Sequence, residues 1–222
     1  MACFERLGWP GWKALAEVCE AARQAGLLVI ADGKRGDVPV TAKAYGQAMV
    51  GTTESPFGTV DGLGADAFTA NPLLGEDALE PMVAAAEASG AGVFALVRTS
   101  NPGAADVEDL VTPEGPVHER LAVTVDRFAD RLAGQETGLS GMGAVVGATA
   151  PEHIARLREL MPSAIFLIPG VGAQGGKPED LGAAFAPGRA AAMIAASRSI
   201  AGAEDPAGAA EELRSTVWTI SG

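Results

Sequence analysis

The sequence predicts an α/β fold in which helices cover a parallel sheet, because short apolar runs alternate regularly with helical segments along the chain. The runs are rich in Val, Ile, Leu and Ala without polar alternation, as expected for strands buried on both faces. Polar and glycine-rich residues follow the C-terminal end of most runs. A (β/α)8 barrel carries its active site at that end of its strands, whereas an open doubly wound sheet uses only its switch point. We therefore expect residues 1–222 to form a single (β/α) barrel domain, although only about six of the eight βα units are recognisable.

The first half of the chain is predicted to hold two of these units after an N-terminal helix. Pro10 suits a first helical position and Gly26 follows an apolar stripe at helical spacing, so a helix is expected between them. In order, the expected elements are a loop over 1–8, a helix over 10–26, a strand over 27–31, a helix over 41–50, a Gly-, Thr- and Ser-rich segment over 51–63 with a short turn of helix near Pro56, a strand over 66–70 and a helix over 76–89.

The second half is predicted to hold the remaining units, with a long polar loop after its first strand. Loops of that length are often functional. In order, the expected elements are a strand over 92–98, the polar loop over 103–116, a helix over 117–134, a strand over 144–149, a helix over 151–161, a strand over 164–168, a glycine-rich loop over 169–176, a short helix over 178–185, a strand over 190–196 and a helix over 206–219.

Composition excludes several classes of function. The net charge of −12 argues against binding to nucleic acid or to anionic membranes, and no apolar stretch is long enough to span a bilayer. Two cysteines do not make a disulfide framework, so a cytoplasmic setting is expected. His118 and His153 lack metal-type spacing to each other or to the cysteines, and we expect no zinc or other metal site.

The segment Asp32-Gly33-Lys34-Arg35-Gly36-Asp37 is the first candidate for catalysis, because it follows a predicted strand directly. A strand places residues 32 and 34 on the same side, and a carboxylate beside an ammonium keeps both groups ionised near neutral pH. Asp32 and Lys34 are thus expected to form a charged proton donor. Gly36 lets the backbone turn, which carries Asp37 either back toward the same point or away from it. The alternative is a salt-bridge cluster in a surface loop.

A second candidate is the glycine-rich loop together with Arg198. Residues 170–175 match a dinucleotide fingerprint, but the acid expected about 20 residues later is missing. Barrels instead bind phosphate between the last two strand-following loops, where backbone N–H groups and Arg198 would share it. The alternative is a tight turn and a surface arginine. Counting this loop as the seventh makes the charged segment the third, so two strands are missing at the front.

These motifs together resemble those of the orotidine 5′-monophosphate decarboxylase family. Asp32-x-Lys34-x-x-Asp37, followed by Pro39 and Thr41, is similar to its catalytic signature. The loops Thr99–Gly103 and Pro169–Gly176 are similar to those of the bacterial long-loop (type 2) subfamily. The resemblance implies a homodimeric (β/α)8 barrel, a carboxy-lyase of pyrimidine biosynthesis that converts orotidine monophosphate into uridine monophosphate and CO2 without a metal or an organic cofactor.

The resemblance also implies roles for individual residues. Lys34 would protonate C6 of the pyrimidine, Asp32 would hold Lys34 charged beside the substrate carboxylate, and Asp37 would reach across the dimer. The departing CO2 leaves a carbanion at C6 that no adjacent carbonyl stabilises, so a fixed positive charge with a ready proton is what the reaction needs. The implied substrate-binding residues, of which Ser100 would bind the pyrimidine edge and Gln174 and Arg198 the phosphate, are Thr41, Asn71, Ser100, Pro169, Gly172, Gln174, Gly175 and Arg198.

The sequence departs from the family at its start. The family's first two strands carry an aspartate and a second lysine that complete a Lys-Asp-Lys-Asp array, whereas residues 1–6 resemble the segment after that lysine. We expect a truncated chain lacking roughly 50–60 residues if barrel units average about 30 residues. Such a chain would have exposed strand edges, a tendency to aggregate and weak or no activity.

Two alternatives stay open. Magnesium-dependent sugar-phosphate decarboxylases and synthases of the same superfamily share Asp-x-Lys-x-x-Asp, although Arg35-Gly36 and the Thr99–Gly103 loop argue against them. The chain could also be an inactive barrel or fragment that only binds nucleotides. Loss of activity on chelation would favour the magnesium enzymes, and nucleotide binding without turnover would favour the fragment.

Overall fold

Six strands form one sheet in the order β1-β4-β5-β8-β9-β10, as the apolar runs predict. The pairs β1–β4, β4–β5, β8–β9 and β9–β10 are parallel. The structure is a computed structural model that describes residues 1–222. The chain divides into two compact units, Met1–Ala95 and Leu96–Gly222, with the boundary inside strand β5.

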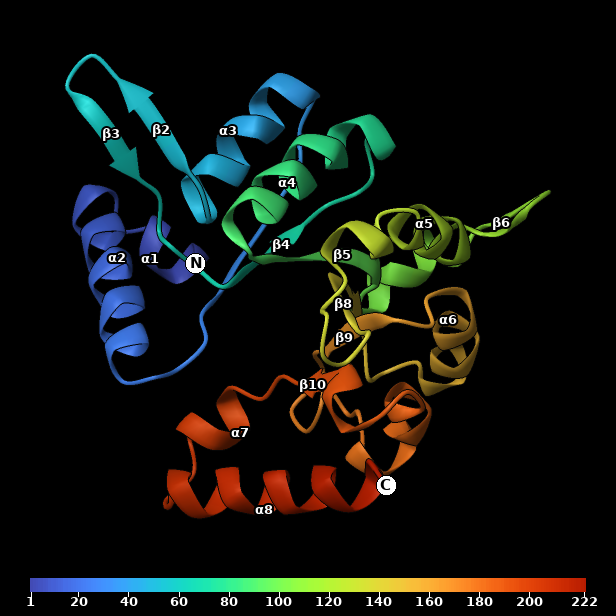
Figure 1. Cartoon of the computed structure of the whole chain (residues 1–222). Coiled ribbons are helices and arrows are strands. Elements are labelled where there is room, and N and C mark those ends of the chain that lie inside the picture. Colours follow the sequence, from blue (N-terminus) through green and yellow to red (C-terminus); the bar gives the residue numbers. More distant parts are fainter. The chain divides into compact units, whose positions relative to one another are not determined.

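The first unit packs two helices against its strands (Figure 1). Its core holds the large buried side chains of Met49, Phe68, Leu79 and Met82. Helices α3 and α4 lie side by side, and a Cβ on Gly46 would stand 2.8 Å from the Ala85 Cβ, so the glycine allows this close approach. The elements are α1 Ala2–Glu5, α2 Trp9–Gln24, β1 Ile30–Arg35, α3 Pro39–Met49, β2 Thr52–Ser55, β3 Gly58–Asp61, β4 Ala67–Ala70, α4 Glu76–Ser89 and β5 Gly92–Arg98.

Three predictions for this unit are wrong. Residues 2–5 form a helix rather than a loop. The first strand begins at Ile30 rather than at residue 27, because Gly26 adopts a positive φ and pairing with β4 starts only at Ile30; Leu28 is left 83% exposed. The expected turn of helix near Pro56 is a β-hairpin of β2 and β3, in which the Ser55 hydroxyl accepts from Phe57 N–H and donates to the Gly58 carbonyl.

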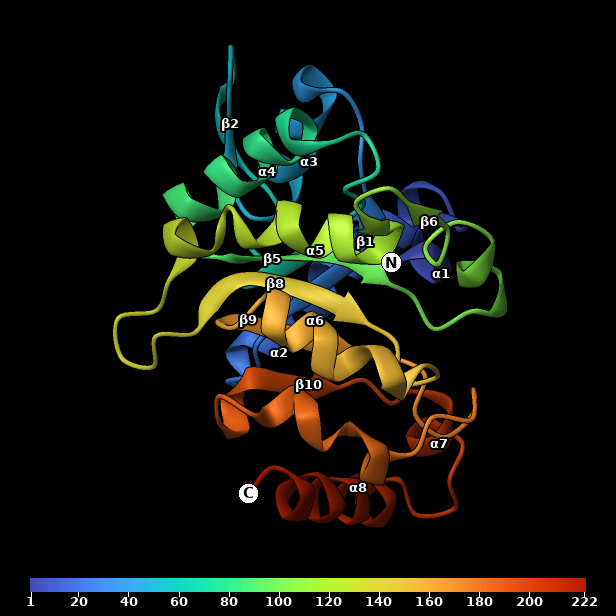
Figure 2. The ribbon, with the colours of Figure 1, turned by 90° about the vertical axis from the view of Figure 1, so that its right-hand side faces the viewer.

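The second unit packs helices α5 and α6 side by side, with α5 against strand β8 (Figure 2). Its core includes Met142, Ile154, Leu157 and Phe166. The elements that follow β5 are the 3-10 helix η1 Pro102–Asp106, β6 Val111–Thr112, β7 Gly115–Pro116, α5 Val117–Asp126, η2 Ala129–Leu132, β8 Ser140–Val146, η3 Pro151–His153, α6 Ile154–Leu160, β9 Ala164–Ile168, η4 Pro178–Phe185, η5 Arg189–Ala191, β10 Ala192–Ile194, α7 Arg198–Ala201 and α8 Pro206–Ile220.

Boundaries in this unit differ from prediction where local hydrogen bonds intervene. The predicted helix over 117–134 ends at Asp126, and the strand predicted from residue 144 begins at Ser140. Ser140 is buried and its hydroxyl donates to the Ala129 carbonyl, which ties the strand start to η2. The predicted last strand over 190–196 is shorter, since η5 replaces its start.

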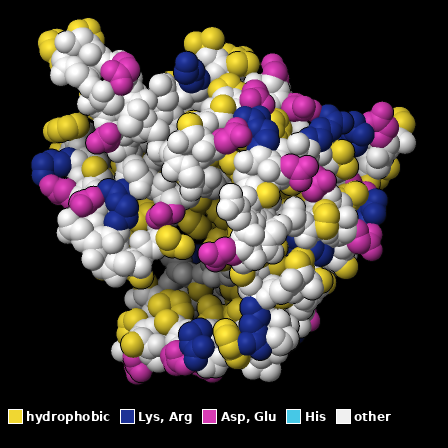
Figure 3. Space-filling model, in the orientation of Figure 1, with side chains coloured by type: hydrophobic (Ala, Val, Ile, Leu, Met, Phe, Trp, Pro, Cys, Tyr) yellow, Lys and Arg dark blue, Asp and Glu magenta, His cyan; other side chains and the backbone are white.

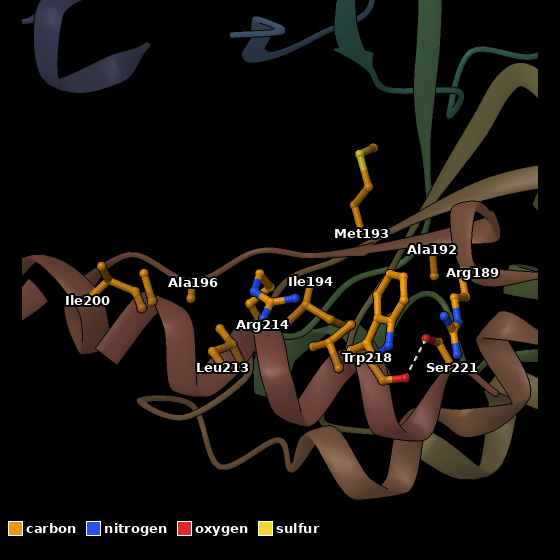
Figure 4. A pocket seen from close by; sticks show the side chains of 12 residues that line it. Arg189, Ala192, Met193, Ile194, Ala196, Ile200, Leu213, Arg214, Trp218 and Ser221 are labelled. Carbon is orange, nitrogen blue, oxygen red and sulfur yellow. Dashed lines mark hydrogen bonds between the residues drawn. The ribbon is translucent and has the colours of Figure 1, made fainter. Parts of the chain in front are cut away.

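Helix α8 leaves an apolar groove of about 420 Å³ beside β10. Ile194 and Trp218 point into this groove, whereas Met193 points away from it (Figure 4). The Arg189 guanidinium lies 3.8 Å from the Trp218 ring centre. Hydrophobic side chains gather on the surface here, above α8 in the lower part of Figure 3. Across the whole chain, none of the helices combines the length and hydropathy that a membrane span requires.

Candidate functional site

Asp32 and Lys34 meet at the C-terminal end of β1, as their spacing predicts. The Lys34 ammonium donates to Asp32 Oδ1 over 2.5 Å. Lys34 is the one non-glycine residue with a positive φ, at 49°, and the register of β1 with β4 shifts between Ala31 and Arg35. The pair therefore sits on an irregular strand end rather than on a regular strand.

Thr69 holds both members of this pair, and sequence reasoning missed it. Its hydroxyl donates to Asp32 Oδ1 over 2.9 Å and accepts from the Lys34 N–H over 2.8 Å. Thr69 lies in β4 and is 1% exposed. The available signal was a polar side chain inside the otherwise apolar run Ala67–Ala70.

The electrostatics favour an ionised pair. Partial burial opposes ionisation of Asp32, but the hydrogen bond and charge of Lys34 outweigh burial, with help from Thr69. The pKa of Asp32 is therefore held below its ordinary value of 3.8. Asp32 therefore stays a carboxylate at neutral pH and accepts the hydrogen bond of the Lys34 ammonium.

Asp37, Thr41 and Asn71 lie in the segments that follow β1 and β4, and their contacts are local. Asp37 accepts a hydrogen bond from the Val38 N–H over 2.7 Å. Thr41 lies in the first turn of α3. The Asn71 side chain accepts from the Leu73 N–H over 3.0 Å, and its backbone packs so closely on Gly36 that a Cβ there would lie 2.5 Å from the Asn71 oxygen.

The glycine-rich loop and Arg198 line one small cavity of about 190 Å³, as predicted for a phosphate site. Ten residues line it, namely Pro169, Gly170, Val171, Ala173, Gln174, Ala195, Ala196, Ser197, Arg198 and Ser199. The predicted contribution of the Gly172 and Gly175 N–H groups needs correction. Those groups donate to the carbonyls of Gly176 and Gly172, so the two glycines shape the loop through their positive φ angles.

A second cavity of about 470 Å³ holds Ser100, the residue expected at the pyrimidine edge. Gln174 lines both cavities. The Thr149 hydroxyl donates to the Ser100 carbonyl over 3.0 Å. Sequence reasoning missed Thr149 as a site residue, because it was assigned to a strand, and also missed Arg98, which lines the same cavity.

His118 and His153 lie close together, although the sequence gives them no metal-type spacing. Their ring centres are 4.5 Å apart, and ligand atoms of Asp109, His118 and His153 all lie within 4.8 Å of one another. These are the residues of this chain that could hold a metal ion. The donors are already used within the protein, however. Arg98 donates to both oxygens of Asp109, and His118 Nδ1 lies 2.9 Å from the Glu108 carbonyl.

The chain is similar to known orotidine 5′-phosphate decarboxylases. A family model described as "Orotidine 5′-phosphate decarboxylase / HUMPS family" matches residues 1–213. Orotidine 5′-phosphate decarboxylase from Deinococcus radiodurans is 44% identical over 200 residues, which cover 90% of this chain and 68% of the relative. The enzyme from Rhodopirellula baltica is 44% identical over 203 residues, covering 90% of this chain and 65% of the relative. The chain thus spans about two thirds of the length of these curated relatives.

Solved structures show the same fold. A putative orotidine 5′-phosphate decarboxylase from Streptomyces avermitilis superposes with a TM-score of 0.81 at 35% identity, covering 99% of this chain and 74% of that chain. A putative orotidine-monophosphate-decarboxylase from Toxoplasma gondii gives a TM-score of 0.81 at 30% identity, covering 99% and 78%.

Proposed function

The chain belongs to the orotidine 5′-phosphate decarboxylase / HUMPS family, and we propose that it serves the conversion of orotidine 5′-monophosphate into uridine 5′-monophosphate and CO2. The observation that carries this proposal is the Lys34–Asp32 pair at the end of β1, supported by Thr69. A protonated amine held by a carboxylate is the group that a carbanion intermediate requires.

The chemistry assigned to the pair is a proton transfer coupled to loss of CO2. The bond between C6 and the carboxylate carbon breaks, its electron pair stays on C6, and CO2 leaves. The Lys34 ammonium then donates a proton to C6, forms the new C–H bond and regains its proton from solvent. Asp32 holds the Lys34 ammonium in place before this step, through the hydrogen bond that also depresses the pKa of the Asp32 carboxyl. No cofactor takes part in the proposed step.

A nucleoside monophosphate fits the two cavities of the second unit. We assign the phosphate to Gln174 and Arg198, beside Pro169 and the loop shaped by Gly172 and Gly175. The pyrimidine is assigned to the neighbouring cavity with Ser100. Gln174 lines both, so one ligand with an anionic end and a planar polar end can span them. Phosphate binding remote from the reacting carbon supplies energy to hold the substrate there.

We further propose that the protein works as a homodimer in the cytoplasm. Val38 and Val40 are 55% and 85% exposed, beside Asp37 and Thr41 at the start of α3. An apolar face next to two polar site residues suits a second copy of this chain, with Asp37 and Thr41 entering the partner's site. Asn71 is assigned to the wall of that site. Both cysteines are free, as expected in a reducing compartment.

The second candidate is a magnesium-dependent sugar-phosphate enzyme, because the matching family includes that branch. Such an enzyme would use the same acidic residues to hold Mg²⁺ and would lose activity on chelation. In this chain the Asp32 carboxylate already accepts a hydrogen bond from the Lys34 ammonium, which favours proton donation over metal binding. Turnover in the presence of EDTA separates the two reactions.

Replacement of Lys34 by alanine tests the proposed reaction. We expect CO2 release from orotidine monophosphate to fall by about a thousandfold or more, because a general acid and a fixed charge are lost together. Calorimetry should show uridine monophosphate binding within about threefold of wild type, since Lys34 acts mainly in the transition state. Lys43→Ala, at an exposed position in α3, is the matched control and should change neither quantity. Full turnover in Lys34→Ala would contradict the assignment, and a wild-type chain that binds the nucleotide without turnover would identify a binding fragment.

A further inference from the structure

The segment that follows β5 is tied back to the strand end by two acidic residues. The Arg98 guanidinium donates to both oxygens of Asp109, over 2.8 Å from Nε and 2.9 Å from Nη2. One residue earlier in the loop, Glu108 accepts from the Thr99 N–H over 2.7 Å and from the Thr99 hydroxyl over 3.0 Å. Bidentate and charge-assisted contacts of this kind fix orientation as well as distance.

His118 adds a third tie from the start of α5. Its side chain is 3% exposed, and Nδ1 lies 2.9 Å from the Glu108 carbonyl and 3.2 Å from Asp109 Oδ1. Its backbone N–H donates to the same carbonyl over 2.8 Å. A nitrogen at that distance from a carbonyl oxygen carries the proton, so His118 acts as a hydrogen-bond donor through Nδ1. A cation would have to displace Arg98 from Asp109.

Ser100 lies directly beyond these ties and has little room to move. A Cβ on Gly147 would stand 2.7 Å from the Ser100 Cα, and a Cβ on Gly170 would stand 2.9 Å from the Ser100 Cβ. The Ser100 carbonyl accepts from Thr149. The serine is therefore held between two glycines on one side and the tied segment on the other.

We propose that Arg98, Glu108, Asp109 and His118 form an anchor whose function is to position Ser100 and Asn101 against the nucleobase. They are positioning residues, because they act through the loop and not on the reacting atoms. This inference rests on the proposed function, since it takes Ser100 to bind the pyrimidine edge. A hydrogen bond weakens steeply with misalignment, so a small displacement of Ser100 costs affinity for the base.

The anchor is separate from the residues assigned to the phosphate, so its effect on binding can be told apart from a general loss of structure. Gln174 and Arg198 line the phosphate cavity, and none of the four anchor residues does. Loosening the anchor should thus weaken contacts to the base and leave contacts to the phosphate intact. A general loss of structure would weaken both.

The experiment compares Asp109→Asn with Glu114→Gln. Both changes turn a carboxylate into an amide in the same loop, but Glu114 forms an exposed ion pair with Arg120 over 2.8 Å. Calorimetric titrations use uridine monophosphate and, separately, inorganic phosphate. We expect Asp109→Asn to raise the dissociation constant for uridine monophosphate about tenfold, which corresponds to the loss of one charged hydrogen bond. Its dissociation constant for inorganic phosphate should stay within about twofold of the wild-type value. Glu114→Gln should change neither.

A second readout does not depend on any ligand. Hydrogen exchange of the backbone over residues 99–103 should be faster in Asp109→Asn than in wild type or Glu114→Gln, because the Thr99 N–H is part of the tied segment. His118→Gln keeps a side-chain donor and should increase hydrogen exchange over the same residues by a smaller amount. This variant replaces Asp109→Asn in the test if Asp109→Asn folds poorly.

The possible failures are distinguishable. A wild-type chain that does not bind uridine monophosphate overturns the proposed function before any variant is measured. A wild-type chain that binds it while both anchor variants bind equally well overturns the anchor alone. Parallel weakening of nucleotide and phosphate binding also overturns it, since that result indicates a general structural role.

Discussion

Lys34 combines an unusual backbone with the central side chain of the site. A positive φ costs a non-glycine residue about 1–2 kcal/mol, and such residues persist only where their surroundings fix them. Thr69 supplies that support, because its hydroxyl bonds both the Lys34 N–H and the Asp32 carboxylate. The sequence could identify Asp32 and Lys34 through their spacing. It could not identify Thr69, because the partner strand and its register are set by tertiary pairing.

Removal of the Thr69 hydroxyl should raise the pKa of Asp32. In the wild type, the pKa of Asp32 is lower in the folded than in the unfolded protein, where it is 3.8. Ionised Asp32 therefore stabilises the fold above pH 3.8, and this stabilisation is lost as the pH falls through the lower pKa of the folded state. Thr69→Val loses one hydrogen bond to the carboxylate, so Asp32 should titrate at a higher pH than in the wild type. Thr69→Ser keeps the hydroxyl and should titrate as the wild type does. Carbon-13 NMR of the Asp32 carboxyl between pH 2 and 6 measures this directly, and identical curves for all three proteins would contradict it.

At the scale of elements, regular strands and helices were predictable and irregular segments were not. Helix α4 and strands β5 and β9 have the predicted bounds, because hydrophobic pattern alone defines them. The 52–61 hairpin was missed because its strands are almost wholly exposed and carry no apolar alternation. The clustering of His118 and His153 was missed for a related reason, since loops and a 3-10 turn bring them together.

Arg158 joins four elements of the second unit and should be important for stability. It is 6% exposed, lies 3.7 Å from the Phe166 ring centre, and burial lowers its pKa to about 10, so it remains charged at neutral pH. Its guanidinium donates to backbone carbonyls around it, those of Met161, Ala164, Ala184 and Ala191. Arg158→Met removes a buried donor from these carbonyls and should lower the free energy of unfolding by about 3 kcal/mol or more.

Urea denaturation of Arg158→Met against Arg156→Met measures this contribution. Arg156 lies on the same helix, but its ion pairs with Glu119 and Glu159 are exposed, so Arg156→Met should lower the free energy of unfolding far less than Arg158→Met does. Equal urea midpoints for the two variants would show that the buried guanidinium stabilises the protein no more than a surface ion pair does.

At the scale of the whole molecule, the sequence predicted the fold class because βα alternation is a global pattern. Six parallel strands and the family match confirm that class. The residues assigned to the proposed function were predictable to different extents. Asp32 and Lys34 follow from a strict side-chain period, and Arg198 follows from the position of its loop. The glycine loop was predicted as a set of phosphate donors, yet two of its N–H groups bond within the loop.

The proposed homodimer gives the prediction that belongs to this largest scale. Val40 is 85% exposed in the first turn of α3, so Val40→Glu places a carboxylate on the proposed interface. An acidic residue near a helix N-terminus does not destabilise the helix, so the monomer should keep its fold. Light scattering should show a dimer for wild type and a monomer for Val40→Glu at micromolar concentrations, because an unpaired buried charge is costly at an interface. Val60→Glu, 57% exposed on the β2–β3 hairpin, is the control and should remain dimeric. A wild-type monomer would exclude the proposed dimer, and a dimer that tolerates Val40→Glu would place the contact elsewhere. Either result would remove Asp37 and Thr41 from a shared site.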